Sequence, residues 1–192
     1  MPRGIARDHD EKRHALRRGA ARYFARHGYD RASMVGAARE CGVSKALIYH
    51  YYDSKNALLF DILDTYLAEL VEVVEAAARQ GLPGLIQAIL STYEDADAEH
   101  KLQIDALATL PADLQAPLIH HQRRLVGIMS SAIAETRPDL PPDRLRATTM
   151  TVFGILNWFY MWHRPGKGLD RAEYARLAAD FVHGGIASVP AE

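Results

Sequence analysis

A helical repeat of apolar residues runs through most of this chain and constrains its fold more than any other feature. Between residues 58 and 74, leucine, isoleucine, valine and tyrosine recur every three or four positions, so they share one face of an α-helix. Further segments with this period follow, separated by proline and glycine, and no segment alternates apolar and polar residues as a half-buried strand does. The pattern therefore predicts an all-α protein of about nine helices.

Prolines, glycines and capping residues mark where these helices should begin and end. Residues 1–10 lack apolar periodicity and are expected to form a mobile arm before a helix over residues 11–27, which Gly28 ends. A later helix, capped by Asp53 or Ser54, should continue until residues 81–84 break it. The remaining helices are expected over residues 85–96, 100–110, 112–136, 142–163 and 171–187, with turns at 138–142 and 164–168.

Composition narrows the cellular setting. The chain has 192 residues, 48% of them hydrophobic, which is enough to bury a sizeable core. The first thirty residues are charged throughout, and no apolar run reaches the roughly 18 to 20 residues that span a membrane. A single cysteine, Cys41, excludes an internal disulfide and a cysteine-built zinc site. We therefore expect a cytoplasmic protein with no membrane partner and no cofactor.

Charge is divided unevenly along the chain. Residues 1–55 contain twelve Lys and Arg against six Asp and Glu, a net charge of +6, whereas the remaining residues carry a net charge of −7. A basic head on an acidic body indicates an anionic partner that meets the head, because only the contacting face needs to be positive. Composition alone leaves a second interpretation open, in which these residues form a solvated charged helix.

Two short helices are expected between residues 33 and 51. Ser33 and Ser44 each precede one of them and supply a side-chain oxygen for the unpaired N–H groups of its first turn. Gly42 lies in the turn between them, where a left-handed backbone favours glycine. Two capped helices joined by such a turn make a helix-turn-helix, so we expect a DNA-binding head of residues 1–55 and a body of residues 56–192.

The residues around this turn resemble the DNA-binding signature of the TetR family. The stretch that carries the resemblance contains Gly28, Tyr29, Asp30, Arg31, Ala32, Ser33, Met34, Ala38, Cys41, Gly42, Val43, Ser44, Lys45, Tyr49, His50, Tyr51, Tyr52, Ser54 and Lys55. Three positions, Ala37, Cys41 and Tyr52, depart from the residues usual in that family, in ways that suggest altered packing. The resemblance implies a regulator, most commonly a repressor, that binds a double-stranded DNA operator as a homodimer and responds to a small molecule.

A helix of this kind fits the major groove, with its first residues facing base edges and its neighbours holding phosphates. By resemblance, Ser33 and Lys55 belong to a phosphate clamp. Some of these residues have an alternative role that needs no DNA contact. Ser44 can serve only as a helix cap, Tyr49 can pack against the first helix, and Lys55 can be a solvated lysine. The expected DNA-binding residues are Ser33, Met34, Ser44, Lys45, Ala46, Leu47, Tyr49, His50, Tyr51 and Lys55.

The end of the body carries more apolar surface than one subunit can bury. Between residues 152 and 162, apolar and aromatic side chains cover nearly the whole circumference of the expected helix. In the TetR family the last two long helices pair with their copies as a four-helix bundle, and residues 142–163 and 171–187 resemble that pair. The expected dimer contacts are Phe153, Trp158, Trp162, Tyr174 and Phe181.

The segments 153–158 and 162–166 also resemble a branch of the family that controls fatty-acid, steroid or aromatic-acid breakdown. That resemblance implies an acyl-CoA effector, against the alternative of another apolar or aromatic ligand. Polar residues on otherwise apolar helices are the best candidates for orienting such a ligand. The expected ligand-binding residues are Gln103, His120, His121, Arg124, Met129, Phe153, Asn157 and Trp158. For some of these the sequence equally allows other roles, a bond across the dimer for Asn157 and solvent exposure for the two histidines.

The sequence bears on three alternatives to a repressor. An enzyme is disfavoured, because no helix presents a metal-ligand pair and no phosphate loop or nucleophile motif is found. Adjacent His120 and His121 point about 100° apart on a helix, so they do not share a metal. A transcriptional activator and a related protein that no longer binds DNA stay as alternatives.

Overall fold

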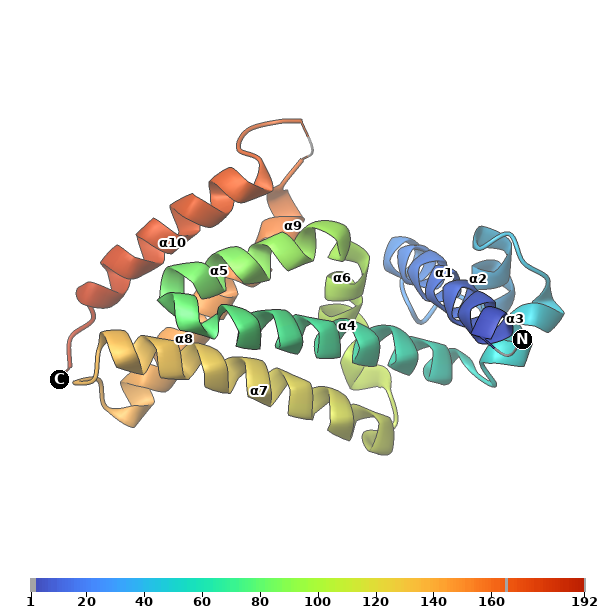
Figure 1. Cartoon of the computed structure of the whole chain (residues 1–192), viewed down its shortest axis with the longest axis horizontal. Coiled ribbons are helices and arrows are strands. Elements are labelled where there is room, and N and C mark those ends of the chain that lie inside the picture. Colours follow the sequence, from blue (N-terminus) through green and yellow to red (C-terminus); the bar gives the residue numbers. More distant parts are fainter. Residues whose placement is uncertain (1–2, 165, 192) are drawn as a thin grey trace. The chain divides into compact units, whose positions relative to one another are not determined.

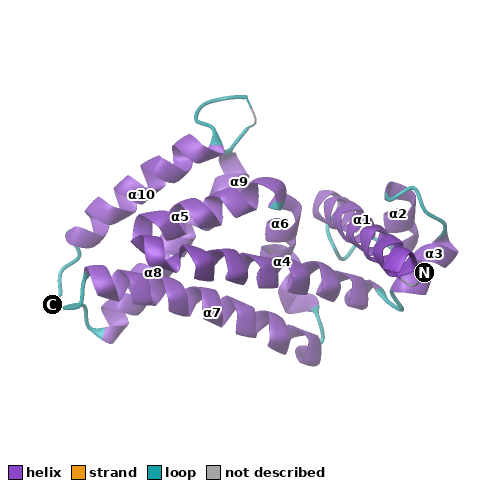
Figure 2. Ribbon diagram, in the orientation of Figure 1, coloured by secondary structure: helices purple, strands orange, loops and turns teal. Residues whose placement is uncertain are grey.

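The computed structural model describes residues 3–164 and 166–191, and in them the backbone forms helices, turns and loops (Figure 2). The α-helices are α1 (Arg3–His27), α2 (Met34–Glu40), α3 (Lys45–Tyr51), α4 (Lys55–Ala77), α5 (Gly81–Thr92), α6 (Asp97–Ala106), α7 (Ala112–Thr136), α8 (Pro142–Asn157), α9 (Phe159–Trp162) and α10 (Arg171–Ala187) (Figure 1). Short 3-10 helices are η1 (Ala78–Gln80), η2 (Tyr93–Asp95) and η3 (Leu107–Thr109). The all-α prediction is confirmed, and no helix in the described ranges is long and apolar enough to cross a membrane.

Two long helices of the body have the bounds that the sequence predicts. Both α7 and α10 begin and end at the expected residues. At the start of α10, the Asp170 carboxylate accepts a hydrogen bond from the Glu173 N–H at 2.7 Å, and Glu173 accepts one from the Asp170 N–H at 2.8 Å. This reciprocal pair satisfies two backbone donors that the helix itself leaves unpaired.

Several helix ends differ from expectation, among them both ends of α5 and α6, which span Gly81–Thr92 and Asp97–Ala106 rather than residues 85–96 and 100–110. Helix α1 begins at Arg3, so residues 3–10 are helical rather than a mobile arm, while residues 1 and 2 lie outside the described part. Helix α5 begins at Gly81 because Pro83 falls in its first turn, where its missing N–H has no partner to lose. The helix expected over residues 142–163 is interrupted at Trp158, and Pro165 of the following turn lies outside the described residues.

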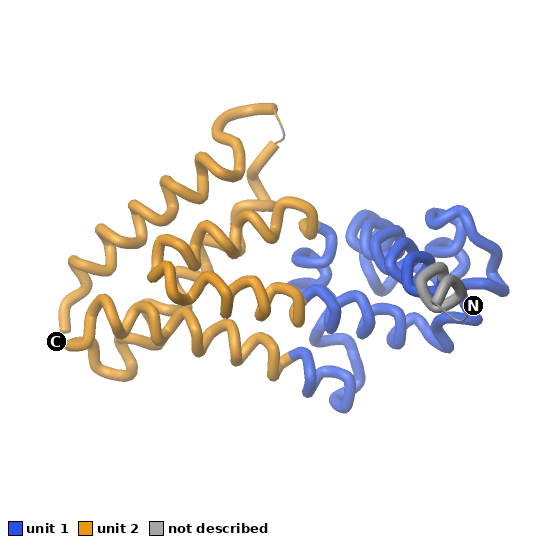
Figure 3. The backbone as a smooth tube through the Cα atoms, in the orientation of Figure 1, with its two compact units in different colours: residues 1–66, 98–118 blue, residues 67–97, 119–192 orange. Residues whose placement is uncertain are grey.

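The chain forms two compact units (Figure 3). One unit consists of Met1–Tyr66 and Ala98–Leu118, and the other of Leu67–Asp97 and Ile119–Glu192. The first is filled by side chains such as Phe24, Ile48 and Leu58, and in the second α10 packs against α5. Since these units interleave along the sequence, the expected division at residue 55 stays a prediction.

Candidate nucleic-acid interface

Helices α2 and α3 form a helix-turn-helix, and local hydrogen bonds define both of them. The Ser33 Oγ accepts a hydrogen bond from the Gly36 N–H at 3.1 Å, and the Ser44 Oγ accepts one from the Leu47 N–H at 3.1 Å. Gly42 has a φ of 68°, which an L side chain rarely adopts. The caps and the turn predicted from the sequence are therefore confirmed, and they set where α3 begins.

Glycines let α2 approach α1 closely. A Cβ added to Gly36 would lie 1.9 Å from the Oη of Tyr23, and one added to Gly19 would lie 2.5 Å from the Sγ of Cys41. The Cys41 thiol donates to the Leu16 carbonyl at 3.6 Å, and partial burial raises its pKa. This environment holds α2 against α1 and disfavours the reactive thiolate.

One side of α3 is buried and the other faces outward. Ile48 is fully buried, whereas Lys45, Ala46, Tyr49 and His50 are exposed, with 41% of the Tyr49 surface accessible. The Lys45 Nζ lies 5.8 Å from the centroid of the Tyr49 ring. Leu47 is half-buried beside them. An exposed strip of a lysine, a histidine and a tyrosine on a short helix has the donors and apolar edges that a major groove accepts.

The remaining predicted contacts divide into exposed and buried groups. Ser33 and Ser44 are exposed, while Tyr51 is half-buried with its ring 4.7 Å from His9 and 5.5 Å from His50. Met34 is only 6% exposed. The Met34 side chain therefore fills the core beneath α2 and is not part of the exposed surface of the motif, while a role for Met34 in DNA binding stays a prediction.

Lys55 has partners other than the phosphate that the resemblance implies. Its Nζ donates to the carbonyls of Tyr29 at 2.9 Å, Ala32 at 3.1 Å and Asp30 at 3.4 Å, and it lies 4.3 Å from the centroid of the Tyr29 ring. An ammonium group has three N–H donors, so these carbonyls use all of them. Lys55 in this arrangement fixes the loop between α1 and α2.

A second network, which the sequence did not indicate, joins α1, the end of α3 and α4 through Asp61. Its carboxylate accepts hydrogen bonds from the Tyr52 Oη at 2.6 Å and from Arg13 at 2.6 Å and 3.1 Å, with Arg17 at 3.5 Å. Burial, followed by the hydrogen bond to Asp61, raises the pKa of Tyr52 above its ordinary value. Tyr52 occupies a position where the family usually has phenylalanine. Its additional hydroxyl was the one sign in the sequence that a hydrogen-bond partner lies nearby.

The expected ligand-binding residues lie in varied environments. Met129 and Phe153 are buried, and the Gln103 Oε1 is buried with no hydrogen-bond partner in the described residues. Asn157 accepts a hydrogen bond from the Tyr93 Oη at 3.0 Å within its own subunit. The Tyr93 pKa is raised by burial, so its hydroxyl stays protonated as the donor.

Most of the other expected ligand-binding residues lie on the surface. Arg124 is exposed and pairs with Glu75 at 2.7 Å, His120 is exposed and His121 is half-buried. Trp158 is 62% exposed at the break between α8 and α9. These residues do not have the buried setting that an enclosed ligand site requires within one subunit.

The outer face of α8, α9 and α10 is apolar and open. Phe181 is 67% exposed and Trp162 is 49% exposed, and Phe181 lines a groove of about 270 Å³ between α8 and α10. Among the residues predicted to contact a partner subunit, Phe153 is buried in its own subunit instead. Tyr174 is half-buried, with its ring stacked 4.5 Å from that of Phe159.

Sequence comparisons identify the family. The profile of bacterial regulatory proteins of the tetR family matches residues 16–62, and that of the tetracyclin repressor-like C-terminal domain matches residues 75–186. The chain belongs to the TetR family. It is a TetR-type transcriptional regulator with an amino-terminal helix-turn-helix.

Individual relatives agree with this assignment. The HTH-type transcriptional repressor Rv1474c of Mycobacterium tuberculosis is 28% identical over 159 residues, which cover 76% of this chain and 80% of that one. A TetR-family regulator from Bordetella parapertussis superposes with a TM-score of 0.81 at 30% identity, over 88% of this chain and 93% of that one. AibR, solved with isovaleryl coenzyme A and operator DNA, has the same fold, with a TM-score of 0.74 at 21% identity over 91% and 97% of the two chains.

Within this TetR-family protein, two lysines of the head are expected to respond differently to removal. Lys55→Met should weaken operator binding without changing its dependence on salt, because the ammonium group holds carbonyls rather than a phosphate. Lys45→Ala should change base preference, and it should lower the salt slope by about 0.9 if its charge displaces one counterion. Fluorescence anisotropy at several salt concentrations measures both slopes. A slope that falls in Lys55→Met would instead support the phosphate clamp.

Proposed function

We propose that this protein is a ligand-responsive repressor that binds a palindromic operator as a homodimer and is released by a small apolar effector. The observation that carries the proposal is the two-sided character of α3. Ile48 anchors this helix in the core, while Lys45, Ala46, Tyr49 and His50 remain on its open side. A helix held in this way can enter a major groove without giving up its own packing.

The exposed residues of α3 divide into two kinds of DNA contact. The Lys45 ammonium and the His50 ring can donate to purine acceptors, and Ala46 and Leu47 can pack against a thymine methyl. Ser33 and Tyr51 lie at the margins of the motif, where hydroxyl groups contact phosphates. Met34 and Lys55 are left out of this surface, because one is buried and the other is held by the loop carbonyls.

The apolar face of α8, α9 and α10 supports a homodimer. A Cβ built at Gly154, Gly184 or Gly185 meets no atom of the described residues within 4 Å, so these backbones are open to close approach by another helix. Exposed Trp158, Trp162 and Phe181 are the apolar anchors that such an interface uses. A two-fold pair of heads then matches a palindrome with half-sites about 34 to 36 Å apart.

An apolar effector, either an acyl-CoA or another fatty or aromatic acid derivative, fits the residues inside the body. The Gln103 Oε1, which is buried and has no hydrogen-bond partner among the described residues, is available to accept a hydrogen bond from such a molecule. AibR, which shares this fold, was solved with an acyl-CoA. A ligand releases DNA only when it favours the conformer that binds the operator less well.

Selection from random duplex DNA with the purified protein tests the first half of this proposal. We expect the bound sequences to contain a palindrome, and a Lys45→Ala/His50→Ala variant to recover no such sequence. Addition of acyl-CoA thioesters of graded chain length should then raise the melting temperature and release the selected operator. Recovery of no enriched sequence would favour a protein that no longer binds DNA, and tighter operator binding with ligand would contradict release by an effector.

A further inference from the structure

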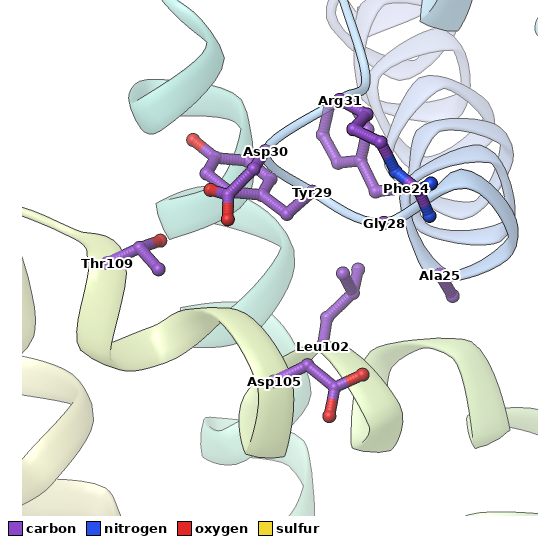
Figure 4. A pocket seen from close by; sticks show the side chains of 9 residues that line it. All are labelled: Phe24, Ala25, Gly28, Tyr29, Asp30, Arg31, Leu102, Asp105 and Thr109. Atoms are coloured by element: carbon purple, nitrogen blue, oxygen red, sulfur yellow. The ribbon is translucent and has the colours of Figure 1, made fainter.

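A cleft of about 400 Å³ lies in the unit that contains the helix-turn-helix, apart from the exposed face of α3 (Figure 4). One side is formed by the end of α1 and the loop after it, and the other by α6 and η3. Phe24, Tyr29 and Leu102 are almost fully buried and form its apolar walls. The volume is within the range of about 300 to 1,000 Å³ that small-molecule sites occupy.

The loop side of this cleft is held in place from behind. The Tyr29 Oη donates to the Asn56 Oδ1 at 2.6 Å, and its ring meets Phe24 edge-on at 5.5 Å. Burial, with a smaller contribution from Asp30, raises the pKa of Tyr29 to about 12, so the hydroxyl remains a donor. Lys55 donates hydrogen bonds to the backbone carbonyls of this loop, so a ligand in the cleft would meet the side chains of the loop.

Two of these side chains carry opposite charges that are not used within the described structure. The Asp30 carboxylate and the Arg31 guanidinium line the cleft on adjacent residues, and neither makes a hydrogen bond or ion pair with another described side chain. The other charged group of the lining, Asp105, already pairs with Lys101. The Thr109 Oγ1 donates to the Ala106 carbonyl at 2.7 Å. Asp30 and Arg31 are therefore the charged side chains of the lining that have no ion-pair partner among the described residues.

We infer that this cleft binds a free α-amino acid with an apolar side chain. A single small molecule satisfies both unpaired charges when its ammonium group meets Asp30 and its carboxylate meets Arg31, and its side chain can then lie against Ala25 of α1. An amine alone would leave Arg31 unmatched and a carboxylic acid alone would leave Asp30 unmatched. This site is additional to the effector site proposed above, and its existence does not depend on that proposal.

Isothermal titration with a matched series of probes tests the inference. The probes are L-phenylalanine, L-leucine, phenethylamine, which lacks the carboxylate, and 3-phenylpropionate, which lacks the ammonium group. We expect at least one of the two amino acids to bind, with phenylalanine binding about tenfold or more tightly than either of its analogues, as the loss of one charged hydrogen bond implies. Asp30→Asn should remove the advantage of phenylalanine over 3-phenylpropionate, and Arg31→Gln its advantage over phenethylamine.

A third variant separates binding in the cleft from binding elsewhere. Ala25 is half-buried and lines the cleft from α1, so Ala25→Phe should fill it and abolish amino-acid binding. Circular dichroism shows whether this variant is folded; the two loop variants, which change exposed side chains, keep the test valid if it is not. Failure of both amino acids to bind, or affinities that the Asp30 and Arg31 variants leave unchanged, would overturn the inference.

Discussion

A Phe181→Arg variant is expected to be monomeric at micromolar concentration and to bind the operator at least a hundredfold more weakly than the unmodified protein. The Phe181 ring is 67% exposed on α10, beside an apolar groove and near glycines whose backbones are open. An arginine there would bury an unpaired charge in each half of a two-fold interface. Two linked heads gain about 10² to 10⁴ in avidity over one, and a monomer loses that gain.

Light scattering measures the mass of the variant, and anisotropy with the selected operator measures its affinity. Val73→Arg is the matched control, because Val73 is an exposed apolar residue of α4 that does not line the groove between α8 and α10. The control should remain dimeric and bind the operator normally. Unmodified protein that is monomeric at micromolar concentration would contradict the proposed homodimer, as would a Phe181→Arg variant that stays dimeric.

An Asp61→Ala variant is expected to lose about 2 kcal/mol of stability and to bind the operator at least tenfold more weakly. The Asp61 carboxylate is the shared acceptor for Tyr52 and Arg13, so its removal leaves a buried hydroxyl and a guanidinium without their acceptor. Tyr52 directly follows the last residue of α3. Loosening this end should therefore change how the recognition helix is held, although Asp61 itself is not an expected DNA contact.

Tyr52→Phe is the control for this network, because it removes one hydrogen bond and leaves the arginine pair in place. Its cost should be about 1 kcal/mol, with a smaller loss of affinity. Denaturation followed by circular dichroism gives the stabilities, and effector-induced thermal stabilisation shows that the body remains intact. An Asp61→Ala variant with unchanged stability and affinity would mean that the network does not position α3.

The parts of the helix-turn-helix that could be predicted from the sequence depend on contacts between residues close together in the chain. Ser33, Gly42 and Ser44 act within a few residues of themselves, so their roles follow from sequence spacing and are confirmed by the structure. The roles of Met34 and Lys55 depend on which groups fold over them. A motif gives a position for each residue, but burial beneath α2 and capture by the loop carbonyls are set by tertiary packing.

Contacts between distant segments account for what the sequence could not predict. Asp61 meets Arg13 across 48 residues, and the cleft beside Asp30 is closed by residues about seventy positions later. Neither pairing leaves a period or a short motif in the sequence. In the body, the helical pattern predicted α7 and α10 correctly, yet it could not separate the buried Phe153 from the exposed Trp158 on one apolar stretch.

Two of the three limits between the compact units fall inside long helices, at Tyr66 within α4 and at Leu118 within α7, and the third follows Asp97, the first residue of α6. Helix α4 has 23 residues and at 1.5 Å per residue is a rod about 34 Å long, so a rotation at one of its ends is carried to the other unless its backbone hydrogen bonds break. Helix α7 has Pro117 next to Leu118, where one unit ends. The missing N–H of this proline removes one backbone hydrogen bond, so the helix can bend there. Of these two long helices, α4 is therefore stiff along its whole length, whereas α7 can bend at Pro117.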